Sequence, residues 1–225
     1  MLSACIGLAL MGSCSDDDAA LPLVEPQATG TYVDVRDNYE YHWVRINGLD
    51  WTVENAHYQI GDPSKCRFYV PYEDWEEDSP EDKMSDEFGY LYSYQGAQEA
   101  VPEGWRLPTD EDWQQLEMAL GMSEAQASAR EWRGDFAASL MMQKGEGTAL
   151  AFQLGGYYTS YLGYYDPHYW HNGTYGYYWT DTKDENKSGD YIMYRKLAYN
   201  RQQVYRESIE AKEYMLSVRF VRNAE

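Results

Sequence analysis

The sequence between Pro102 and Gly121 specifies both ends of one amphipathic helix. Pro108 disfavours helical geometry at the residue before it. Thr109 suits the N-cap position, and Asp112 three residues later completes a pattern that resembles a capping box. Acidic side chains at 110–112 also favour the positive end of the helix dipole. One apolar face follows, formed by Trp113, Leu116 and Leu120. The run therefore predicts a helix that starts at Thr109 and stops at the glycine.

Two further helical segments are expected after this one. Ser123 is placed to cap a second helix that extends to about Glu131, and Gly134 breaks it. A short helix from Phe136 to Met142 is a further candidate. Beyond residue 147 the chain is expected to contain only strands and loops.

Short strands surround these helices. The Asn47-Gly48 pair is a strong signal for a two-residue hairpin turn. Strands are expected over 32–35, 41–46, 49–53, 89–94 and 216–222, the last as a half-buried strand because its residues alternate. Two helices among short, mostly antiparallel strands and long loops predict a single α+β domain.

The N-terminus has the features of a targeting segment. Residues 2–13 are apolar or small and uncharged, which suits a signal peptide and is too short for a membrane span. Residues 10–14, ending in Cys14, resemble a bacterial lipobox, and the Ser-Asp-Asp-Asp run that follows resembles the surface-export signal of lipoproteins from the Bacteroides group. Cys5 is the alternative lipidation site if translation starts upstream, and an ordinary cleaved signal is a second alternative.

These features divide the chain into three parts. We expect a signal peptide over 1–13, a lipidated acidic tether over 14–30 and a folded domain over 31–225. The protein is then expected in the outer membrane, lipid-anchored and facing the cell exterior. The mature chain retains Cys66 as its one free thiol, so no intramolecular disulfide is expected.

An excess of acidic residues argues against two classes of partner. The chain has 38 acidic and 18 basic residues and a formal net charge of −20. Nucleic acids and anionic membrane surfaces need a basic footprint, so we expect no nucleic acid and membrane contact only through the lipid anchor. The charge favours solubility and would also attract Ca²⁺ or a basic partner. Aromatic residues make up 16% of the chain, which indicates a folded protein.

Six short motifs in a fixed order resemble a bacterial family, the Fibrobacter succinogenes major paralogous domain. They are GLDWTVEN at 48–55, GYLY at 89–92, PEGWRLPTDEDW at 102–113, FQLGG at 152–156, GYYWT at 176–180 and SVRFVR at 217–222. The resemblance covers roughly residues 40–225. It implies a C-type-lectin-like fold, similar to formylglycine-generating enzymes, in a secreted or surface lipoprotein.

The departures from the family pattern concern cysteines. Members often carry one cysteine just before the PEGW run and one after SVR, where this chain has Val101 and Phe220. The resemblance implies that these two side chains lie near each other in the core. Formylglycine-generating enzymes work through C-terminal cysteines, and residues 204–222 contain none, which excludes a thiolate nucleophile there. Nucleophile-elbow, phosphate-loop and dinucleotide motifs are also absent from the sequence.

Two segments contain candidate metal ligands. His168 and His171 lie close to Asp166, although the surrounding loop residues favour surface histidines. Hard oxygen ligands suited to Ca²⁺ occur at Asp181, Asp184, Glu185 and Asp190. Lysines interspersed among these acids favour a solvated loop instead, so no cofactor is expected and Ca²⁺ is only a weak candidate.

Tyrosines and tryptophans concentrate in residues 157–179, which contain nine of the former and two of the latter. The ends of this segment are expected to be core strands, while its middle is too rich in turn residues to bury every ring. The candidate ligand-binding residues are Tyr161, Tyr164, Tyr165, Tyr169, Trp170 and Tyr175. Exposed aromatic rings stack on sugars and anchor protein interfaces, so the sequence predicts a non-catalytic module that binds a glycan or a protein. A glycan-active enzyme with a carboxylate pair and a structural, fimbria-like component are the alternatives.

Overall fold

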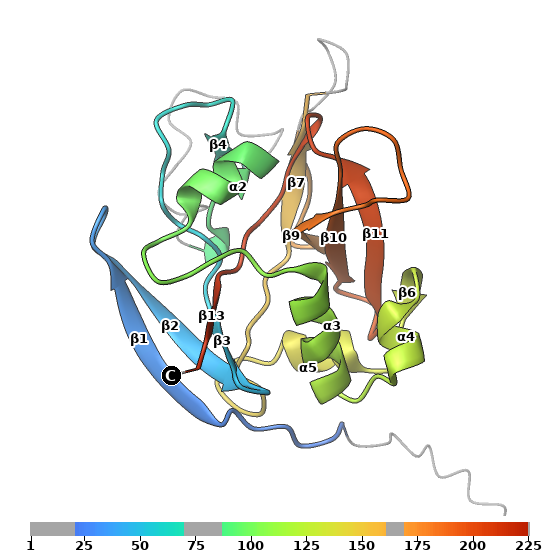
Figure 1. Cartoon of the computed structure of the whole chain (residues 1–225). Helices are drawn as coiled ribbons and strands as arrows, with labels where there is room; N and C mark the ends of the chain where they lie inside the picture. The colour runs from blue at the N-terminus through green and yellow to red at the C-terminus, as the bar shows by residue number, and fades with distance from the viewer. Residues whose placement is uncertain (1–20, 70–86, 161–168, 225) are drawn as a thin grey trace, which may run out of the picture.

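Two β-sheets on opposite sides of helix α3 (Asp110–Ala119) make up most of the fold (Figure 1). The structure is a computed structural model that describes residues 21–69, 87–160 and 169–224. The smaller sheet has the antiparallel order β1-β2-β3-β13. Its strands are β1 (Ala28–Asp34), β2 (Tyr39–Ile46), β3 (Leu49–Thr52) and β13 (Val221–Asn223).

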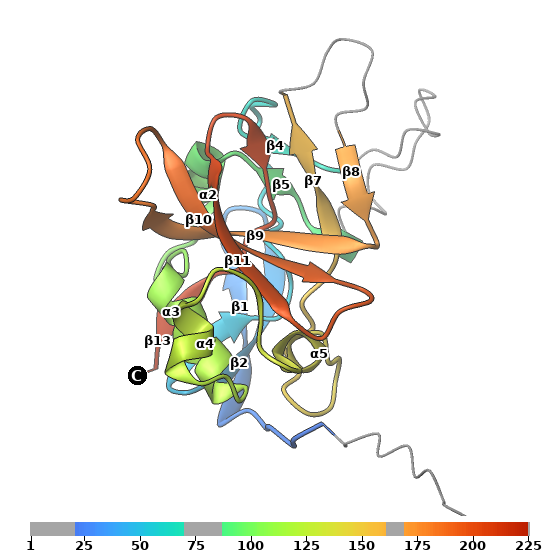
Figure 2. The same cartoon turned by 90° about the vertical axis from the view of Figure 1, so that its right-hand side faces the viewer.

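The larger sheet has the order β12-β7-β9-β10-β11-β6, and β8 pairs with β7 beside this path. Its strands are β12 (Tyr214–Met215), β7 (Gly155–Thr159), β9 (Tyr175–Lys183), β10 (Tyr191–Ala198), β11 (Val204–Glu210), β6 (Glu131–Arg133) and β8 (Tyr169–Asn172). Figure 2 brings β9, β10 and β11 to the front. The pairing of β7 with β9 is parallel and the other named pairs of this sheet are antiparallel.

Short elements complete the described part of the chain. Strands β4 (Cys66–Arg67) and β5 (Leu91–Tyr92) form a two-stranded sheet next to α2 (Tyr94–Ala100). Helices α4 (Glu124–Ser128) and α5 (Ala137–Met141) have five residues each.

The expected α+β, C-type-lectin-like domain with two helices is wrong. Strands hold 37% of the described residues and helices 16%, with a seven-stranded sheet as the largest element. Four helices lie wholly within the described residues, and each has ten residues or fewer. The physical reason is that the aromatic segments after residue 150 pair with one another, so that β-structure dominates.

The expected helix start at Thr109 is confirmed. Its hydroxyl accepts a hydrogen bond from the Asp112 backbone N–H at 3.1 Å, and the Asp112 carboxylate accepts one from the Thr109 N–H at 2.7 Å. Ser123 caps α4 in the same way with Gln126. This second helix ends earlier than expected, at Ser128, because Glu131 pairs with β11.

The half-buried strand with alternating exposure that was expected over 216–222 is wrong. Residues 216–221 are all fully buried and do not alternate. They cross from β12 in the larger sheet to β13 in the smaller one, so both faces of the segment meet protein. Helix α2 is a further departure, because only 91–92 of the segment expected as strand over 89–94 form one and Tyr94 begins the helix.

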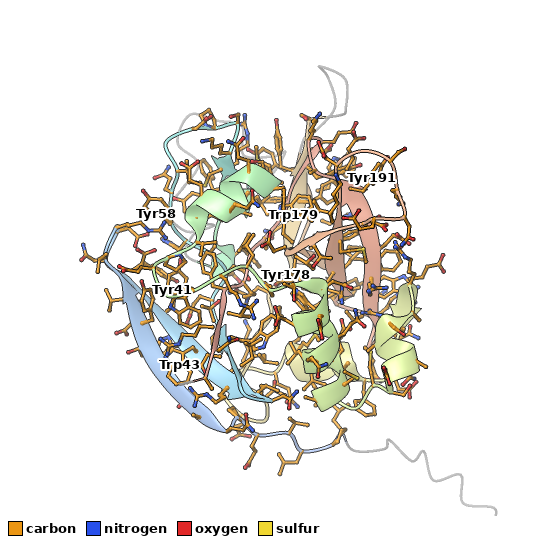
Figure 3. All side chains as sticks on the ribbon, viewed as in Figure 1. Tyr41, Trp43, Tyr58, Tyr178, Trp179 and Tyr191 are labelled. Carbon is orange, nitrogen blue, oxygen red and sulfur yellow. The ribbon has the colours of Figure 1, made fainter. Side chains whose placement is uncertain are left out.

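Trp113 shows how α3 joins the two sheets. Its ring packs 5.2 Å from Trp51 of β3 and 5.8 Å from Tyr178 of β9. All three side chains are buried, and Figure 3 places Tyr178 beside α3. Val101 and Phe220 belong to the second, tyrosine-rich cluster of the core, with Phe220 fully buried and Val101 at its margin. Their direct contact stays a prediction.

The N-terminal boundaries differ slightly from expectation. Strand β1 begins at Ala28, so three residues assigned to the tether pair with β2. Among the described residues no helix combines the length and apolar character needed to cross a bilayer.

Candidate functional site

One face of the larger sheet is lined by aromatic rings. Strand register sets Trp132 of β6 opposite Tyr205 of β11, Tyr205 opposite Lys196 of β10, and Lys196 opposite Tyr177 of β9. Directly opposed residues of neighbouring strands project on the same face. The set that we call the aromatic face comprises Trp132, Tyr157, Tyr175, Tyr177, Tyr194, Tyr205 and Tyr214, together with Lys196.

Ring contacts connect the aromatic face from β6 to β12 without a break. Centroid separations are 5.2 Å for Trp132–Tyr205 and 6.1 Å for Tyr205–Tyr194. They are 6.2 Å for Tyr194–Tyr177 and 5.0 Å for Tyr177–Tyr157. Tyr157 then lies 5.8 Å from Tyr214, and Tyr175 adjoins Tyr177. The Tyr194–Tyr177 pair is stacked and the other pairs are edge-on or tilted, which are arrangements that aromatic rings prefer at these distances.

The two faces of the larger sheet differ in the helices that they meet. Tyr178 and Arg195 point to one side, where they meet α3. Their neighbours Tyr177 and Tyr194 point to the opposite side, as strand alternation requires. On that side Tyr94 of α2 packs against Trp179, and the rings farther from it remain partly exposed. These partly exposed members are Trp132, Tyr157, Tyr175, Tyr205 and Tyr214.

Lys196 lies among four rings of the aromatic face. Its Nζ is 4.0 Å from the Tyr205 centroid and 5.1 Å from that of Trp132, with Tyr177 and Tyr175 slightly farther away. Within the described part of the chain its ammonium has no ion pair. Burial lowers the pKa of Lys196, and the nearby charge of Arg201 lowers it further. The Arg201 guanidinium itself lies 4.7 Å from the Trp132 centroid.

His171 borders the aromatic face at β8. Its Nδ1 lies 3.0 Å from the Tyr177 hydroxyl, and its ring stacks near that of Tyr177. Burial lowers the pKa of His171, and the charge of Lys196 contributes in the same direction. The neutral imidazole is therefore favoured at neutral pH, and its two nitrogens can accept and donate one hydrogen bond each.

The aromatic residues selected from the sequence are only partly described. Tyr161, Tyr164 and Tyr165 lie outside the described residues, as do Asp166 and His168. Tyr175 is part of the aromatic face. Tyr169 instead packs against Tyr158 and Tyr69, and Trp170 is partly exposed with its indole N–H buried.

Sequence reasoning missed Trp132, Tyr194, Lys196 and Tyr205. Their signal was alternation along β10 and β11, where Tyr194 and Lys196 are two residues apart. The sequence alone does not show which strands are neighbours, so the row across the sheet could not be assembled from it.

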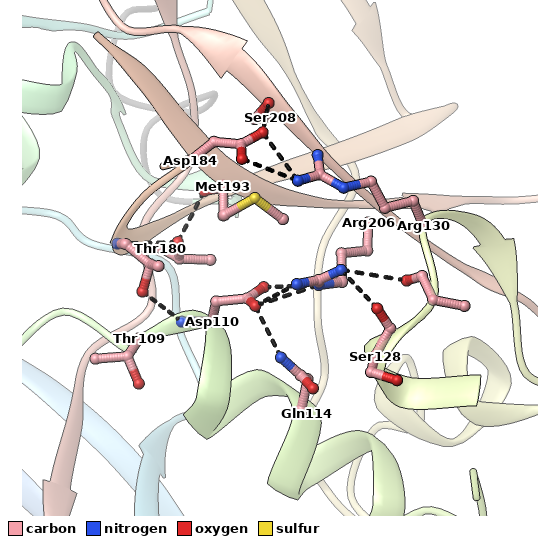
Figure 4. Close-up of polar contacts among 12 residues, drawn as sticks. Thr109, Asp110, Gln114, Ser128, Arg130, Thr180, Asp184, Met193, Arg206 and Ser208 are labelled. Carbon is pink, nitrogen blue, oxygen red and sulfur yellow. Dashed lines mark hydrogen bonds and ion pairs between the residues drawn. The ribbon is translucent and has the colours of Figure 1, made fainter. Parts of the chain in front are cut away.

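The four acids proposed as Ca²⁺ ligands are not brought together. Asp184 is 2% exposed and pairs with Arg130 at 2.9 Å and with the Ser208 hydroxyl at 2.6 Å (Figure 4). Asp181 accepts a hydrogen bond from the Tyr94 hydroxyl, and Asp190 faces two lysines. No group of three potential metal-binding side chains occurs within 21–69, 87–160 and 169–224.

The buried carboxylates of α3 belong to a network of arginines. Arg195 donates to Asp110 at 2.6 Å and to Glu117 at 2.7 Å. Arg206 also pairs with Asp110, as Figure 4 shows, and Arg133 pairs with Glu117. The arginines hold the pKa of Asp110 well below its usual range against the opposing effect of burial. These charges connect α3 to the larger sheet, which is a structural role.

A groove adjoins the aromatic face at Tyr214, which lines the smaller of its two hollows. A hollow of about 510 Å³ lies between α2 and the start of β10, and its lining includes Tyr94, Gln95 and Ile192. A smaller hollow of about 240 Å³ shares Ser64, Ser93 and Lys212 with it. Each of the two has a single carboxylate in its lining, Asp190 or Glu213.

The fold and the site define a β-rich domain with a continuous aromatic surface on its larger sheet. The family model of the Fibrobacter succinogenes major domain matches residues 44–222, so the chain belongs to this family. Searches of curated proteins and of solved structures found no match.

Proposed function

We propose that this protein is a lipid-anchored surface module that binds a glycan on its aromatic face without chemical conversion. The observation that carries the proposal is the unbroken row of rings across the larger sheet, in which the buried Tyr177 and Tyr194 connect members that are partly exposed. Flat aromatic rings cover the apolar faces of sugar rings, and their hydroxyl groups reach the sugar hydroxyls. The regular spacing across strands suits an extended polymer.

The polar atoms of this surface support a polar ligand. In the described part of the structure, the hydroxyls of Tyr175 and Tyr205, two partly exposed residues, have no protein hydrogen-bond partner. Tyr and Trp side chains have few rotatable bonds, so ordering them on binding costs little conformational entropy. A glycan would supply hydrogen-bond partners for these hydroxyls and stack on the partly exposed rings.

Binding of soluble polysaccharides by the purified full-length chain tests the proposal. Affinity electrophoresis and calorimetry would use a panel of neutral and acidic glycans. Tyr175→Ala and Tyr205→Ala are expected to weaken binding about tenfold or more, as central aromatic anchors of interfaces do. Tyr199→Ala is the matched control, because this tyrosine lies in the turn after β10, is 65% exposed and is outside the aromatic face.

The outcomes separate the possible ligands. Glycan binding that is unchanged in both Tyr175→Ala and Tyr205→Ala would refute the aromatic face as the binding site. Absence of binding to any glycan of the panel would refute a glycan as the ligand. Capture of a surface protein through Tyr175 and Tyr205 would make a protein the ligand. Release of shortened sugars from a bound glycan would favour the enzyme alternative instead.

The anchor is proposed at Cys14, which lies outside the described residues. Bacteria that express the full chain should incorporate an alkyne-tagged fatty acid into it, and Cys14→Ser should abolish labelling. Cys5→Ser is the control and should keep the label. Protease digestion of intact cells tests exposure to the exterior. Labelling lost in Cys5→Ser and kept in Cys14→Ser would move the anchor to Cys5.

A further inference from the structure

We infer that the ligand of the aromatic face is an acidic glycan whose carboxylates bind Lys196 and Arg201. This inference rests on the proposed glycan-binding function and narrows it to polymers that contain uronic acids. Two cations lie against the same ring, since Lys196 is 5.1 Å and Arg201 is 4.7 Å from the Trp132 centroid. Neither has an ion pair among the described residues.

The absence of an ion pair at Lys196 and Arg201 is unusual for the described part of this chain. The protein has a formal net charge of −20, and most basic side chains of its described part pair with a carboxylate. Arg195, Arg206 and Arg130, for example, each pair with at least one carboxylate. Lys196 and Arg201 therefore form a locally positive surface at the end of the aromatic face, although the protein as a whole is acidic.

The acidic residues nearest to Lys196 and Arg201 do not form ion pairs with them. Glu207 lies opposite Tyr194 in register, but it pairs with Arg130 and Lys187. Glu131 is exposed at the edge strand β6, and Asp135 lines the same polar hollow as Arg201. Neither carboxylate comes within ion-pair distance of Lys196 or Arg201. The charge of Lys196 reaches as far as His171, whose pKa it helps to lower.

The rings around Lys196 explain why a charge can remain there. Ammonium groups are attracted to the faces of aromatic rings, and four rings surround this one. Such contacts hold the side chain in place and leave its hydrogen-bond donors without an acceptor oxygen. A carboxylate supplies that acceptor, and Arg201 can bind a second carboxylate oxygen through its planar guanidinium.

The site is therefore expected to bind an acidic polymer more tightly than a neutral polymer with the same backbone. Sugar rings would stack on the tyrosines between β9 and β11. Their carboxylates would reach the cations beside Trp132. A neutral polymer with the same backbone would keep the stacking and lose the charged hydrogen bonds. We expect its affinity to be lower by about tenfold or more.

Matched polymers test this inference with the full-length chain. Polygalacturonate, alginate and hyaluronan would each be compared with its carboxyl-reduced form, which keeps the backbone and removes the charge. The acidic member of at least one pair should bind about tenfold more tightly than its neutral form. Its binding should also weaken as NaCl rises to 1 M, because salt screens the ion pairs.

Variants connect the effect to the two cations. Lys196→Met keeps an unbranched side chain that contacts aromatic rings well, and it should lower acidic-polymer affinity toward the level of the neutral form. Lys196→Arg should retain most of the binding, and Arg201→Gln should show a partial loss. Lys144→Met is the matched control, because this lysine is exposed in a loop away from the sheet. Melting temperatures confirm that each variant is folded.

Each result decides between the two proposals. Equal binding of acidic and neutral forms, or acidic binding unchanged in Lys196→Met, would overturn the inference and leave glycan binding intact. Loss of binding by Tyr175→Ala together with charge discrimination by the parent chain supports both. A chain that binds neither form of any pair overturns both proposals.

Discussion

The Arg219 guanidinium donates a 2.7 Å hydrogen bond to the side-chain oxygen of Asn55, 164 residues earlier in the chain. Arg219 is fully buried, and its other donors reach the backbone carbonyls of Thr52, Leu150 and Ala151. Asn55 in turn donates to the carbonyl of Phe88. One side chain of the SVRFVR motif thus holds the GLDWTVEN motif and the loop before the larger sheet together.

Replacement of this arginine should strongly destabilise the fold. In Arg219→Leu the three carbonyls and the Asn55 oxygen lose their donor while they remain buried. We expect the free energy of unfolding to fall by about 3 kcal/mol or more, since each orphaned buried acceptor costs roughly 1–3 kcal/mol. Denaturant titration measures the change. Arg201→Leu is the control and should change stability by less than about 0.5 kcal/mol, because Arg201 is exposed.

The capping box of α3 gives a smaller and separable effect. Thr109→Ala removes the oxygen that accepts from the Asp112 N–H, and a lost cap of this kind costs about 1 kcal/mol. Glu111→Gln is the control within the same turn, because Glu111 is exposed and acts only through the helix dipole. Thermal unfolding of both variants compares them. Equal melting temperatures would contradict the role of the cap.

Local signals of this kind could be read from the sequence. The capping box, the Asn47-Gly48 turn and the short helix α5 depend on residues within a few positions of one another. Both Asn47 and Gly48 have positive φ, at 51° and 76°, as that turn requires. The expected hairpin strands also form, as β2 and β3.

Features that depend on distant pairing could not be read in this way. Residues 216–221 alternate in hydrophobicity along the sequence. They lie between two sheets and are buried on both sides, so this alternation does not predict which side chains are exposed. The aromatic face likewise combines β6, β7, β9, β10, β11 and β12, whose order along the sheet differs from their order in the chain. Tyr175 could be selected from its tyrosine-rich segment, while Lys196 could not be placed beside Tyr177 and Tyr205 without knowledge of the strand pairing.

Asp184 should make the stability of the protein depend on acid pH. Burial alone would raise its pKa, but hydrogen bonds from Ser208 and the Asn186 backbone, together with the Arg130 charge, outweigh burial and lower the pKa to about 2. The unfolded value is near 3.8, so folding favours the ionised form. The stabilisation is present above about pH 4 and is lost as pH falls toward 2.

Asp184→Asn isolates this contribution. The variant should be less stable than the parent at pH 7, and the difference should shrink between pH 4 and pH 2. Denaturant titration at a series of pH values measures it. Asp190→Asn is the control, because Asp190 is exposed and its lysine contacts are 3.5 Å or longer. A difference that stays constant down to pH 2 would show that Asp184 does not titrate in this way.

The cysteine positions of the family suggest a direct test of the Val101–Phe220 pair. Val101 is the C-cap residue of α2, and Phe220 is fully buried with its ring 6.1 Å from that of Tyr41. Both belong to one hydrophobic cluster. We expect Val101→Cys and Phe220→Cys together to form a disulfide on oxidation, which requires Cα atoms within about 7 Å.

Measurements of the free energy of unfolding distinguish a formed disulfide from two unlinked cysteines that only remove buried side chains. Phe220→Cys alone removes a buried ring and should lower the free energy of unfolding by about 3 kcal/mol. The oxidised double variant should recover about 2–4 kcal/mol relative to its reduced form, because a bridge between 101 and 220 closes a long loop in the unfolded chain. Mass spectrometry would find both introduced thiols protected, while Cys66, buried in the parent, stays reduced. Two introduced cysteines that react freely with a thiol reagent in the folded, oxidised protein would place Val101 and Phe220 too far apart for contact.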